Sequence, residues 1–162
     1  MSLRHEDFCT LLRNGGDERD ILTRKLFNVN MRLFRDNLQY RDLVLRCATY
    51  IRECAMTTRE GYKKPHGYSG ANAGIPWNII ALADGQTLIN PVVIEAGPER
   101  VESESNCGSL LLEAPIWIWR YRRVVVDYYN MSGVKCQLEG YVPTIQHEID
   151  HNNGVLITDR KV

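Results

Sequence analysis

The sequence contains no long hydrophobic run and no excess of charge of either sign. Its 162 residues include 20 lysines and arginines against 20 aspartates and glutamates. Balanced charge argues against a strongly basic surface that would bind nucleic acid or an anionic membrane. No apolar stretch approaches the roughly 18 residues of a membrane-spanning helix. Charges also interrupt the first 22 residues, which excludes the apolar core of a secretion signal. We therefore expect one soluble cytoplasmic domain over residues 1–162, with no specific nucleic-acid partner and no membrane partner.

Cysteine and histidine are both scarce, with five and four residues respectively. An odd cysteine count without a secretion signal argues against a disulfide framework. Cys47 and Cys54 lie on an apolar stripe with helical spacing, so we expect both to be small buried residues of a helix. Cys107 differs because it lies in the polar, glycine-containing segment 103–109, which has no apolar period. A cysteine in such a segment favours a chemical role over packing.

The hydrophobic pattern predicts helices in the first and last thirds of the chain and strands between them. The expected elements are weak helical character over 20–34, a helix over 42–60, a loop over 61–74, strands over 77–82, 88–95 and 134–138, a long β-rich run over 116–129, and a final helix from 140–144 to about 153. Pro143 is tolerated in the first turn of that last helix, and Gly154 suits the residue after its end. Strands clustered between two helices indicate an α+β fold.

The clearest chemical motif is the H-E-x-x-H sequence formed by His147, Glu148 and His151. At about 3.6 residues per turn, the two histidines project from one face of a helix and can bind the same metal ion. Glu148 lies beside them and is able to accept a proton from water at such an ion. Half of the four histidines fall in this motif. This favours a metal site over a solvated helix face that holds two histidines by chance.

The third ligand separates the classes of metalloenzyme that use this motif. Thermolysin-like zincins take a glutamate well downstream, but only 11 residues follow His151 and Asp159 is the one acid among them. Metzincins add a third histidine at a position that Ile157 occupies here. Both classes of protease are therefore disfavoured, and the third ligand is expected upstream.

Three upstream residues are candidates for the third ligand: Cys107, His66 and His5. Cys107 is preferred because His5 lies near the start of the sequence and His66 belongs to a different segment. A Cys-His-His set leaves the fourth tetrahedral position open for water, as a catalytic site requires. A thiolate ligand suits Fe(II), Zn or Ni.

The motifs together resemble those of peptide deformylase, in the same order along the chain. The residues Q-H-E-I-D-H, N-G-V-L and D-R within 146–160 are similar to the family's Q-H-E-x-D-H-x-x-G-V-L-x-x-D-R. Four further segments resemble family motifs. Residues 65–76 resemble G-x-G-x-A-A-x-Q-x-G-V-P, and residues 88–91 resemble L-I-N-P. Cys107 corresponds to the cysteine of E-G-C-L-S, and residues 120–133 resemble R-P-x-x-V-x-V-x-Y-x-D-x-x-G. The resemblance covers about residues 42–160, and the first 40 residues match poorly.

The resemblance implies both a fold and an activity. The fold would have small mixed or antiparallel β-sheets around a central metal-binding helix. The activity would be hydrolysis of the N-formyl group from the N-terminal methionine of newly made polypeptides, which releases formate. One divalent metal is implied, with Fe(II) expected and Zn or Ni as alternatives. The implied partner is an N-formyl-methionyl peptide, with transient association with the ribosome.

The resemblance also assigns roles to individual residues. Cys107, His147 and His151 would bind the metal, and Glu148 would transfer the proton. The side chain of Asn72 and the backbone N–H of Gly108 would bind the developing oxyanion. Gly67 and Ile145 would contact the substrate, while Gln146 and Asp150 would support the metal ligands.

Several residues depart from the family's pattern. Asn72 stands in place of a glutamine, Ser69 and Gly70 replace an alanine pair, and Ser105–Ser109 replaces E-G-C-L-S. Asparagine keeps the amide donor but is one methylene shorter. These changes motivate two alternatives to deformylation: an amidohydrolase of the same fold that acts on a different N-acyl substrate, and a deformylase-like binding or regulatory protein with low turnover.

Overall fold

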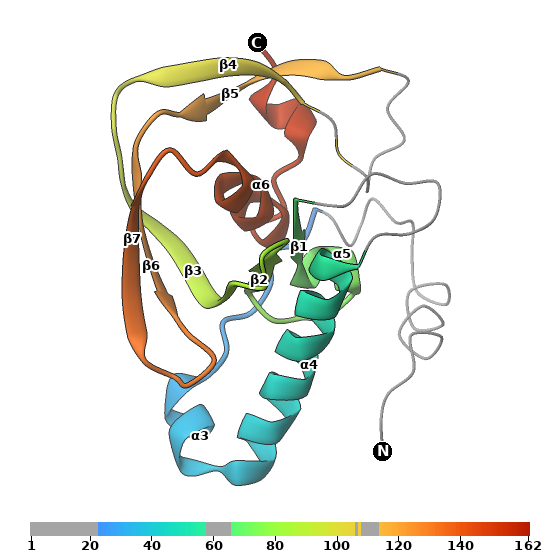
Figure 1. The fold of residues 1–162 in the computed structure, drawn as a ribbon, viewed down its shortest axis with the longest axis vertical. Helices are drawn as coiled ribbons and strands as arrows, with labels where there is room; N and C mark the ends of the chain where they lie inside the picture. Colours follow the sequence, from blue (N-terminus) through green and yellow to red (C-terminus); the bar gives the residue numbers. More distant parts are fainter. Residues whose placement is uncertain (1–22, 58–65, 106, 108–113) are drawn as a thin grey trace.

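A computed structural model describes residues 23–57, 66–105, 107 and 114–162 of the chain (Figure 1). The helices are α3 (Met31–Asp36), α4 (Leu38–Met56), α5 (Gly70–Ala73), α6 (Pro143–Asn152) and the 3-10 turn η1 (Ile157–Arg160). The strands are β1 (Gly67–Ser69), β2 (Ile79–Leu82), β3 (Thr87–Ala96), β4 (Arg100–Ser105), β5 (Ile116–Tyr121), β6 (Val124–Tyr129) and β7 (Lys135–Gly140). In these described ranges, no helix combines the length and apolarity that crossing a bilayer requires.

The strands form two antiparallel sheets. Five strands make one sheet in the order β1-β2-β3-β6-β7, and β4 pairs with β5 in a separate two-stranded ribbon. Figure 1 shows α6 between these elements, with the ribbon above it, β3, β6 and β7 on one side, and β1, β2 and α5 on the other. The expected α+β fold, with small sheets around the H-E-x-x-H helix, is confirmed.

Helix α6 is held against the large sheet by its apolar residues. Ile145 and Ile149 are 3% and 5% exposed, and they pack in one cluster with buried residues of β2, β3 and β6. Pro143 lies in the first turn, where its missing N–H costs no hydrogen bond. Gly154 has a φ of 75°, which suits a chain that leaves a helix by the left-handed region. The predicted position and end of this helix are confirmed.

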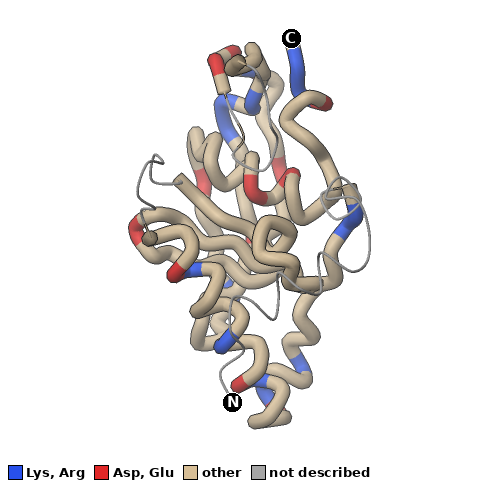
Figure 2. Tube along the Cα trace, turned by 90° about the vertical axis from the view of Figure 1, so that its right-hand side faces the viewer, with Lys and Arg blue, Asp and Glu red and all other residues tan. Residues whose placement is uncertain are grey.

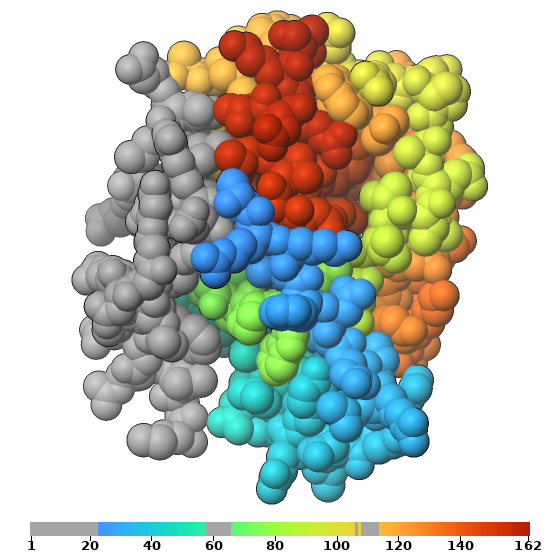
Figure 3. All heavy atoms as spheres, turned by 180° about the vertical axis from the view of Figure 1, so that it is seen from behind, coloured from blue at the N-terminus to red at the C-terminus, as the bar shows by residue number. Residues whose placement is uncertain are grey.

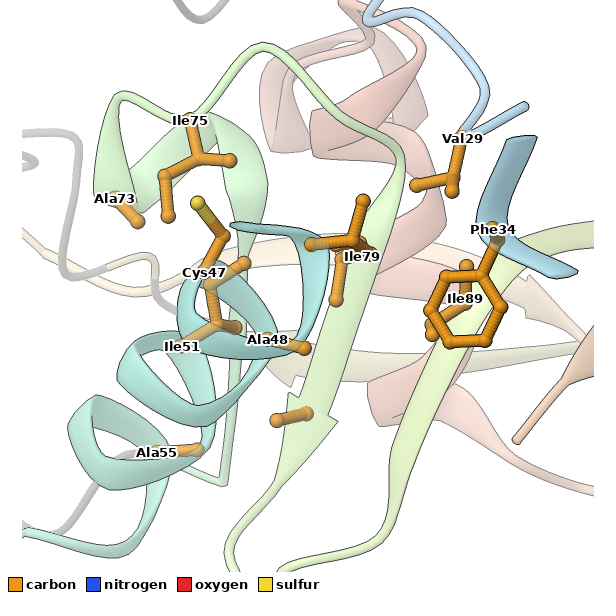
Figure 4. Close-up of a cluster of buried hydrophobic side chains, with 12 residues drawn as sticks. Val29, Phe34, Cys47, Ala48, Ile51, Ala55, Ala73, Ile75, Ile79 and Ile89 are labelled. Atoms are coloured by element: carbon orange, nitrogen blue, oxygen red, sulfur yellow. The ribbon is translucent and has the colours of Figure 1, made fainter. Parts of the chain in front are cut away.

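A second cluster lies between α4 and the β2 end of the sheet. Figure 4 shows the side chains that α4 turns toward Ile75 and Ile79, including Cys47, whose sulfur lies within the cluster. Cys47 is buried as expected, and burial raises the pKa of its thiol. Cys54 is only partly buried. The stripe predicted for this helix is therefore confirmed for Cys47 and holds only in part for Cys54.

The β-rich run expected over 116–129 is confirmed, and the structure divides it into two strands. The chain bends at Arg122 and Arg123, so that β5 and β6 belong to different sheets. At the bend, the N–H of Arg122 donates to Glu99 O at 2.9 Å, and the N–H of Gly97 donates to Arg123 O at 2.9 Å. These two bonds join the bend to the β3–β4 connection and turn the ribbon away from the large sheet.

Other boundaries also differ from the prediction. The helix expected over 42–60 begins at Leu38 and ends at Met56. The described part of the expected loop over 61–74 contains β1 and α5, and β4 was not expected at all. Residues 25 and 27 make isolated β-bridges, and in the described part of the expected 20–34 region, from residue 23 on, helix begins at Met31. In Figure 3 this early segment, in blue, lies directly against the C-terminal residues in red.

Charged residues are spread over the described part of the molecule with both signs interspersed (Figure 2). Exposed ion pairs such as Arg122–Glu99, at 3.1 Å, bring opposite charges together on the surface. This distribution agrees with the equal numbers of basic and acidic residues in the sequence.

Candidate metal centre

Helix α6 presents its two histidines to the same point in space. His147 and His151 are one turn apart, and their Nε2 atoms are 3.0 Å from each other. Cys107 contributes its sulfur from outside the helix, with Sγ 3.3 Å from His151 Nε2. The ligand atoms of all three residues lie within 4.8 Å of one another. The structure thus brings together the three residues that sequence reasoning had singled out for a metal.

The chemistry of this group fits a divalent ion. Tetrahedral ligands with metal bonds of about 2.0–2.3 Å lie roughly 3.3–3.7 Å apart, and His151 Nε2 lies at the similar distances of 3.0 Å from His147 Nε2 and 3.3 Å from Cys107 Sγ. Burial is the largest cause that lowers the pKa of His147 to about 3 and that of His151 to about 4. Both imidazoles are therefore neutral at pH 7, which is the form that binds a metal. Of the two alternative ligands, His66 lies outside this group of three and His5 lies outside the described residues.

Glu148 lies next to the histidines and is buried. It is 4% exposed, and burial raises the pKa of its carboxyl to about 8. Its Oε2 atom has no hydrogen-bond partner among the described residues. A carboxyl group whose pKa is near neutral can accept and release a proton at physiological pH, as a general base must.

Strand β1 approaches Glu148 closely because Gly67 has no side chain. A Cβ at Gly67 would be 2.9 Å from Glu148 Cγ and 2.9 Å from Thr144 Cγ2. Gly67 was expected to contact substrate, and the structure places it directly against Glu148. Two residues further along the same strand face, the Ser69 hydroxyl lowers the pKa of the Glu148 carboxyl group in part.

Asn72 lies on α5, directly after β1. Its Oδ1 atom accepts hydrogen bonds from the Ser69 N–H at 3.0 Å and from the Ser69 hydroxyl at 2.6 Å. Asn152, at the end of α6, accepts from the N–H of Ala71 at 3.2 Å and donates to Ile79 O at 3.1 Å. The helix that carries the metal ligands is thereby bonded to the turn that carries Asn72.

Gln146 and Asp150 hold α6 in place from its other side. Gln146 accepts from the N–H of Tyr121 and donates to Tyr121 O, both at 3.0 Å, so its amide pairs with the end of β5. Asp150 forms a buried ion pair with Arg120 and a partly buried one with Arg160, the latter at 2.9 Å. Arg120 also reaches His147, with Nη2 3.3 Å from the ring Nδ1.

The structure also shows residues that sequence reasoning missed. Ser69, Asn152 and the two arginines that bind Asp150 received no role. The two arginines fall inside segments with family resemblance, and Ser69 has the S-x-x-N spacing of a helix cap. These local signals were present, but the partners lie far away along the chain.

The predicted contacts of two further site residues, Gly108 and Ile145, are not seen in the described part of the chain. Gly108, whose N–H was expected to bind the oxyanion, lies outside the described residues. Ile145, expected to contact substrate, is buried in the cluster between α6 and the sheet. Its contact with substrate stays a prediction.

Comparisons with known proteins agree with this geometry. The family model of polypeptide deformylase matches residues 50–162. The peptide deformylase of Thermotoga neapolitana is 40% identical over 100 residues, which cover 58% of this chain and 60% of that protein. Among solved structures, Plasmodium falciparum peptide deformylase in complex with an inhibitor has a TM-score of 0.66 at 26% identity and covers 88% of this chain and 84% of that one. The Thermotoga maritima enzyme has a TM-score of 0.66 at 25% identity, with coverages of 88% and 91%.

The matches cover the C-terminal two thirds of the chain in sequence and most of it in fold. The family match includes the three candidate ligands and Glu148, whereas residues 1–49 lie outside it. The chain spans 60% of the length of the first Thermotoga relative. More than half of the chain matches the family model, and the fold agrees with solved members over most of its length. The chain therefore belongs to the polypeptide deformylase family.

Proposed function

We propose that the protein removes the formyl group from the N-terminal methionine of newly made polypeptides in a metal-dependent hydrolysis. The observation that carries this proposal is the convergence of Cys107, His147 and His151 beside the buried Glu148. Relatives named peptide deformylase support the choice of substrate. Because the substrate is the start of a nascent chain, the proposal includes transient association with the ribosome.

Cys107, His147 and His151 would hold the metal ion, with Fe(II) as the proposed ion and Zn or Ni as alternatives. The chemistry that such an ion supplies is acidification of water and polarisation of a carbonyl group. Glu148 accepts the proton of the attacking water and passes it to the amine nitrogen that leaves. Gln146 and Asp150 keep the helix that carries these groups in register with β5 and Arg120.

The oxyanion requires donors that are already in place. The proposed donors are the side-chain amide of Asn72 and the N–H of Gly108. The orientation of Asn72 supports its part in this role. Because the amide oxygen accepts two hydrogen bonds from Ser69, the amide nitrogen is turned away from Ser69. Loss of one such donor typically costs about 10²–10³ in rate.

The test is formate release from a formyl-Met tripeptide by anaerobically prepared Fe(II) or Ni protein. Glu148→Ala removes the proton carrier, and Glu104→Ala, on exposed β4, is a matched control. We expect the wild type and Glu104→Ala to release formate at equal rates and Glu148→Ala to lose nearly all activity. Equal release by wild type and Glu148→Ala, with metal at full occupancy, would overturn the proposal. Acetyl and longer N-acyl peptides in the same assay would reveal an amidohydrolase with a different substrate.

The ligand set has its own test. Cys107→Ser replaces a thiolate with a weak ligand, so metal affinity should fall sharply, whereas Cys136→Ser should bind metal as the wild type does. Cys136 is a free, partly buried cysteine on β7 and lies outside the group of three. Unchanged metal affinity in Cys107→Ser would contradict the assignment of this ligand.

A further inference from the structure

Ser69 occupies an unusual position between two groups that the proposed reaction needs. It ends β1, caps α5 and is 0% exposed. Its hydroxyl donates to Asn72 Oδ1 at 2.6 Å and accepts from the Asn72 N–H at 3.3 Å. Ser69 also lowers the pKa of the Glu148 carboxyl group in part. One buried hydroxyl, on the strand that approaches the proposed proton carrier, thus bonds to the proposed oxyanion donor.

One of these contacts exceeds what a capping box requires. A capping box consists of the bond from the Asn72 N–H to the Ser69 hydroxyl and the bond from the Ser69 N–H to the Asn72 side chain, and both are present. The bond from the Ser69 hydroxyl to Asn72 Oδ1 is additional. On the same strand face, Gly67 leaves the space into which Glu148 fits. Strand β1 therefore carries both the contact with Glu148 and the fully buried hydroxyl that bonds to Asn72.

We propose that Ser69 is a positioning residue that holds the Asn72 amide in one fixed orientation beside Glu148. This inference rests on the proposed function. The Ser69 N–H and hydroxyl both donate to Asn72 Oδ1, which determines the face on which the amide nitrogen lies. Without the hydroxyl, one of these two donors is lost and the Asn72 amide can rotate. Asn72, which is shorter than glutamine, depends on such a fixed orientation to present its donor.

The experiment compares Ser69→Ala with Ser103→Ala, a serine on β4 outside the site. We expect Ser69→Ala to lower kcat about tenfold, the scale of one or two hydrogen bonds. The change in KM should stay below about twofold, because orientation and not binding is affected. In an Asn72→Ala background the same change should cost less than about threefold, since the partner is already absent. Ser69→Cys, of similar volume but with a weak donor, should share the defect if the alanine variant folds poorly.

A second readout does not depend on activity. In a nitrogen–proton correlation spectrum of the metal-free protein, the side-chain amide of Asn72 is identified by its loss in Asn72→Ala. Ser69→Ala should move this signal, and Ser103→Ala should leave it in place. An unmoved signal in Ser69→Ala would overturn the positioning role. Equal kcat values in folded Ser69→Ala and Ser103→Ala would overturn it as well. The third contradicting outcome is a double variant whose loss in kcat equals the product of the losses in Ser69→Ala and Asn72→Ala. If the wild type releases no formate but the signal moves, the proposed function fails while the arrangement at Ser69 is supported.

Discussion

Replacing Gly67 with alanine tests how closely β1 must approach the proton carrier. The added Cβ would lie 2.9 Å from both Glu148 Cγ and Thr144 Cγ2 and 3.1 Å from Glu148 Oε1. Carbon atoms in ordinary contact are about 3.5–4.0 Å apart, so the side chains of Glu148 and Thr144, or the strand and helix that carry the contact, must shift by roughly 0.6–1.1 Å. Both partner atoms lie on α6, which also carries the two histidines. The substitution should therefore displace Glu148 from its position relative to the metal ligands.

The expected effect on activity is larger than the effect on stability. A displacement of about 1 Å in a catalytic group can cost about 10²-fold in rate, and this is the predicted loss in kcat/KM. Overpacking of a buried contact typically costs about 1–3 kcal/mol, so the variant should stay folded within a usual stability of about 5–15 kcal/mol.

Gly97→Ala is the matched control for this substitution. The nearest atoms to a Cβ at Gly97 are Arg123 Cβ and O, both at the ordinary distance of 3.5 Å. Both variants also lose the same freedom of glycine in the unfolded chain, so this contribution cancels between them. The assay is formate release together with urea unfolding. If Gly67→Ala and Gly97→Ala release formate at the same rate, the close approach to Glu148 has no part in function.

Three further predictions concern stability. Gly70→Ala restores a residue that the family pattern has, but its Cβ would lie 2.3 Å from Trp77 O. We therefore expect the free energy of unfolding to fall by about 1–3 kcal/mol. Urea titrations measure this change, and an unchanged unfolding midpoint would refute the prediction. Asp150→Asn leaves the buried Arg120 and the partly buried Arg160 without a full counter-charge. For the buried pair with Arg120 the loss should be about 3–5 kcal/mol, measured in the same way against the exposed Asp36→Asn. Burial lowers the pKa values of the two site histidines from 6.5 to about 3 and 4 and raises that of Glu148 from 4.5 to about 8. Below pH 6.5 the unfolded chain binds more protons than the folded chain, because its two histidines are protonated there. Between pH 6.5 and 8 the folded chain binds one proton more than the unfolded chain, on Glu148. From these groups, the metal-free protein should be most stable near pH 6.5, and a free energy of unfolding that rises from pH 6.5 to 8 would contradict the assignment.

Local patterns in the sequence predicted the parts of the site that lie on one element. His147 and His151 are four residues apart, so helical geometry alone places them on one face. The end of that helix followed from Gly154, which takes a left-handed conformation. The third ligand is 40 positions before His147, and periodicity contains no information about such a distance. Cys107 was preferred because of its polar surroundings, and only the fold shows its sulfur beside His151.

The errors in the fold prediction have physical causes. The apolar pattern continues without a break through β5 and β6 because both strands are buried on at least one face. The bend between them, at Arg122 and Arg123, is held by hydrogen bonds to residues 97 and 99, which are more than 20 positions away in the sequence. Strand β4 was missed because its alternating side chains are mostly serine and glutamate, which face the surface on one side of a two-stranded ribbon. The short strand β1 lies in a glycine-rich segment, and its glycine at position 67 is explained by contact with α6.

The alterations relative to the family motifs are connected to one another in the structure. Gly70 accommodates the backbone of Trp77, and Ser69 bonds to the asparagine that replaces the family's glutamine. The shorter amide and the buried hydroxyl next to it therefore belong to one local arrangement. This arrangement is compatible with an oxyanion donor at Asn72, and it gives the altered first motif a physical explanation.

The central claim is that one metal ion, held by Cys107, His147 and His151, supports hydrolysis of a formyl-peptide. The most direct measurement is a titration of the metal-free protein with Fe(II) or Ni under anaerobic conditions, with formate release from a formyl-Met tripeptide recorded at each addition. We predict that the rate rises in proportion to the metal added and stops rising at about one ion per chain. Formate release by the metal-free protein, or a rate that does not change as the metal is added, would contradict the claim.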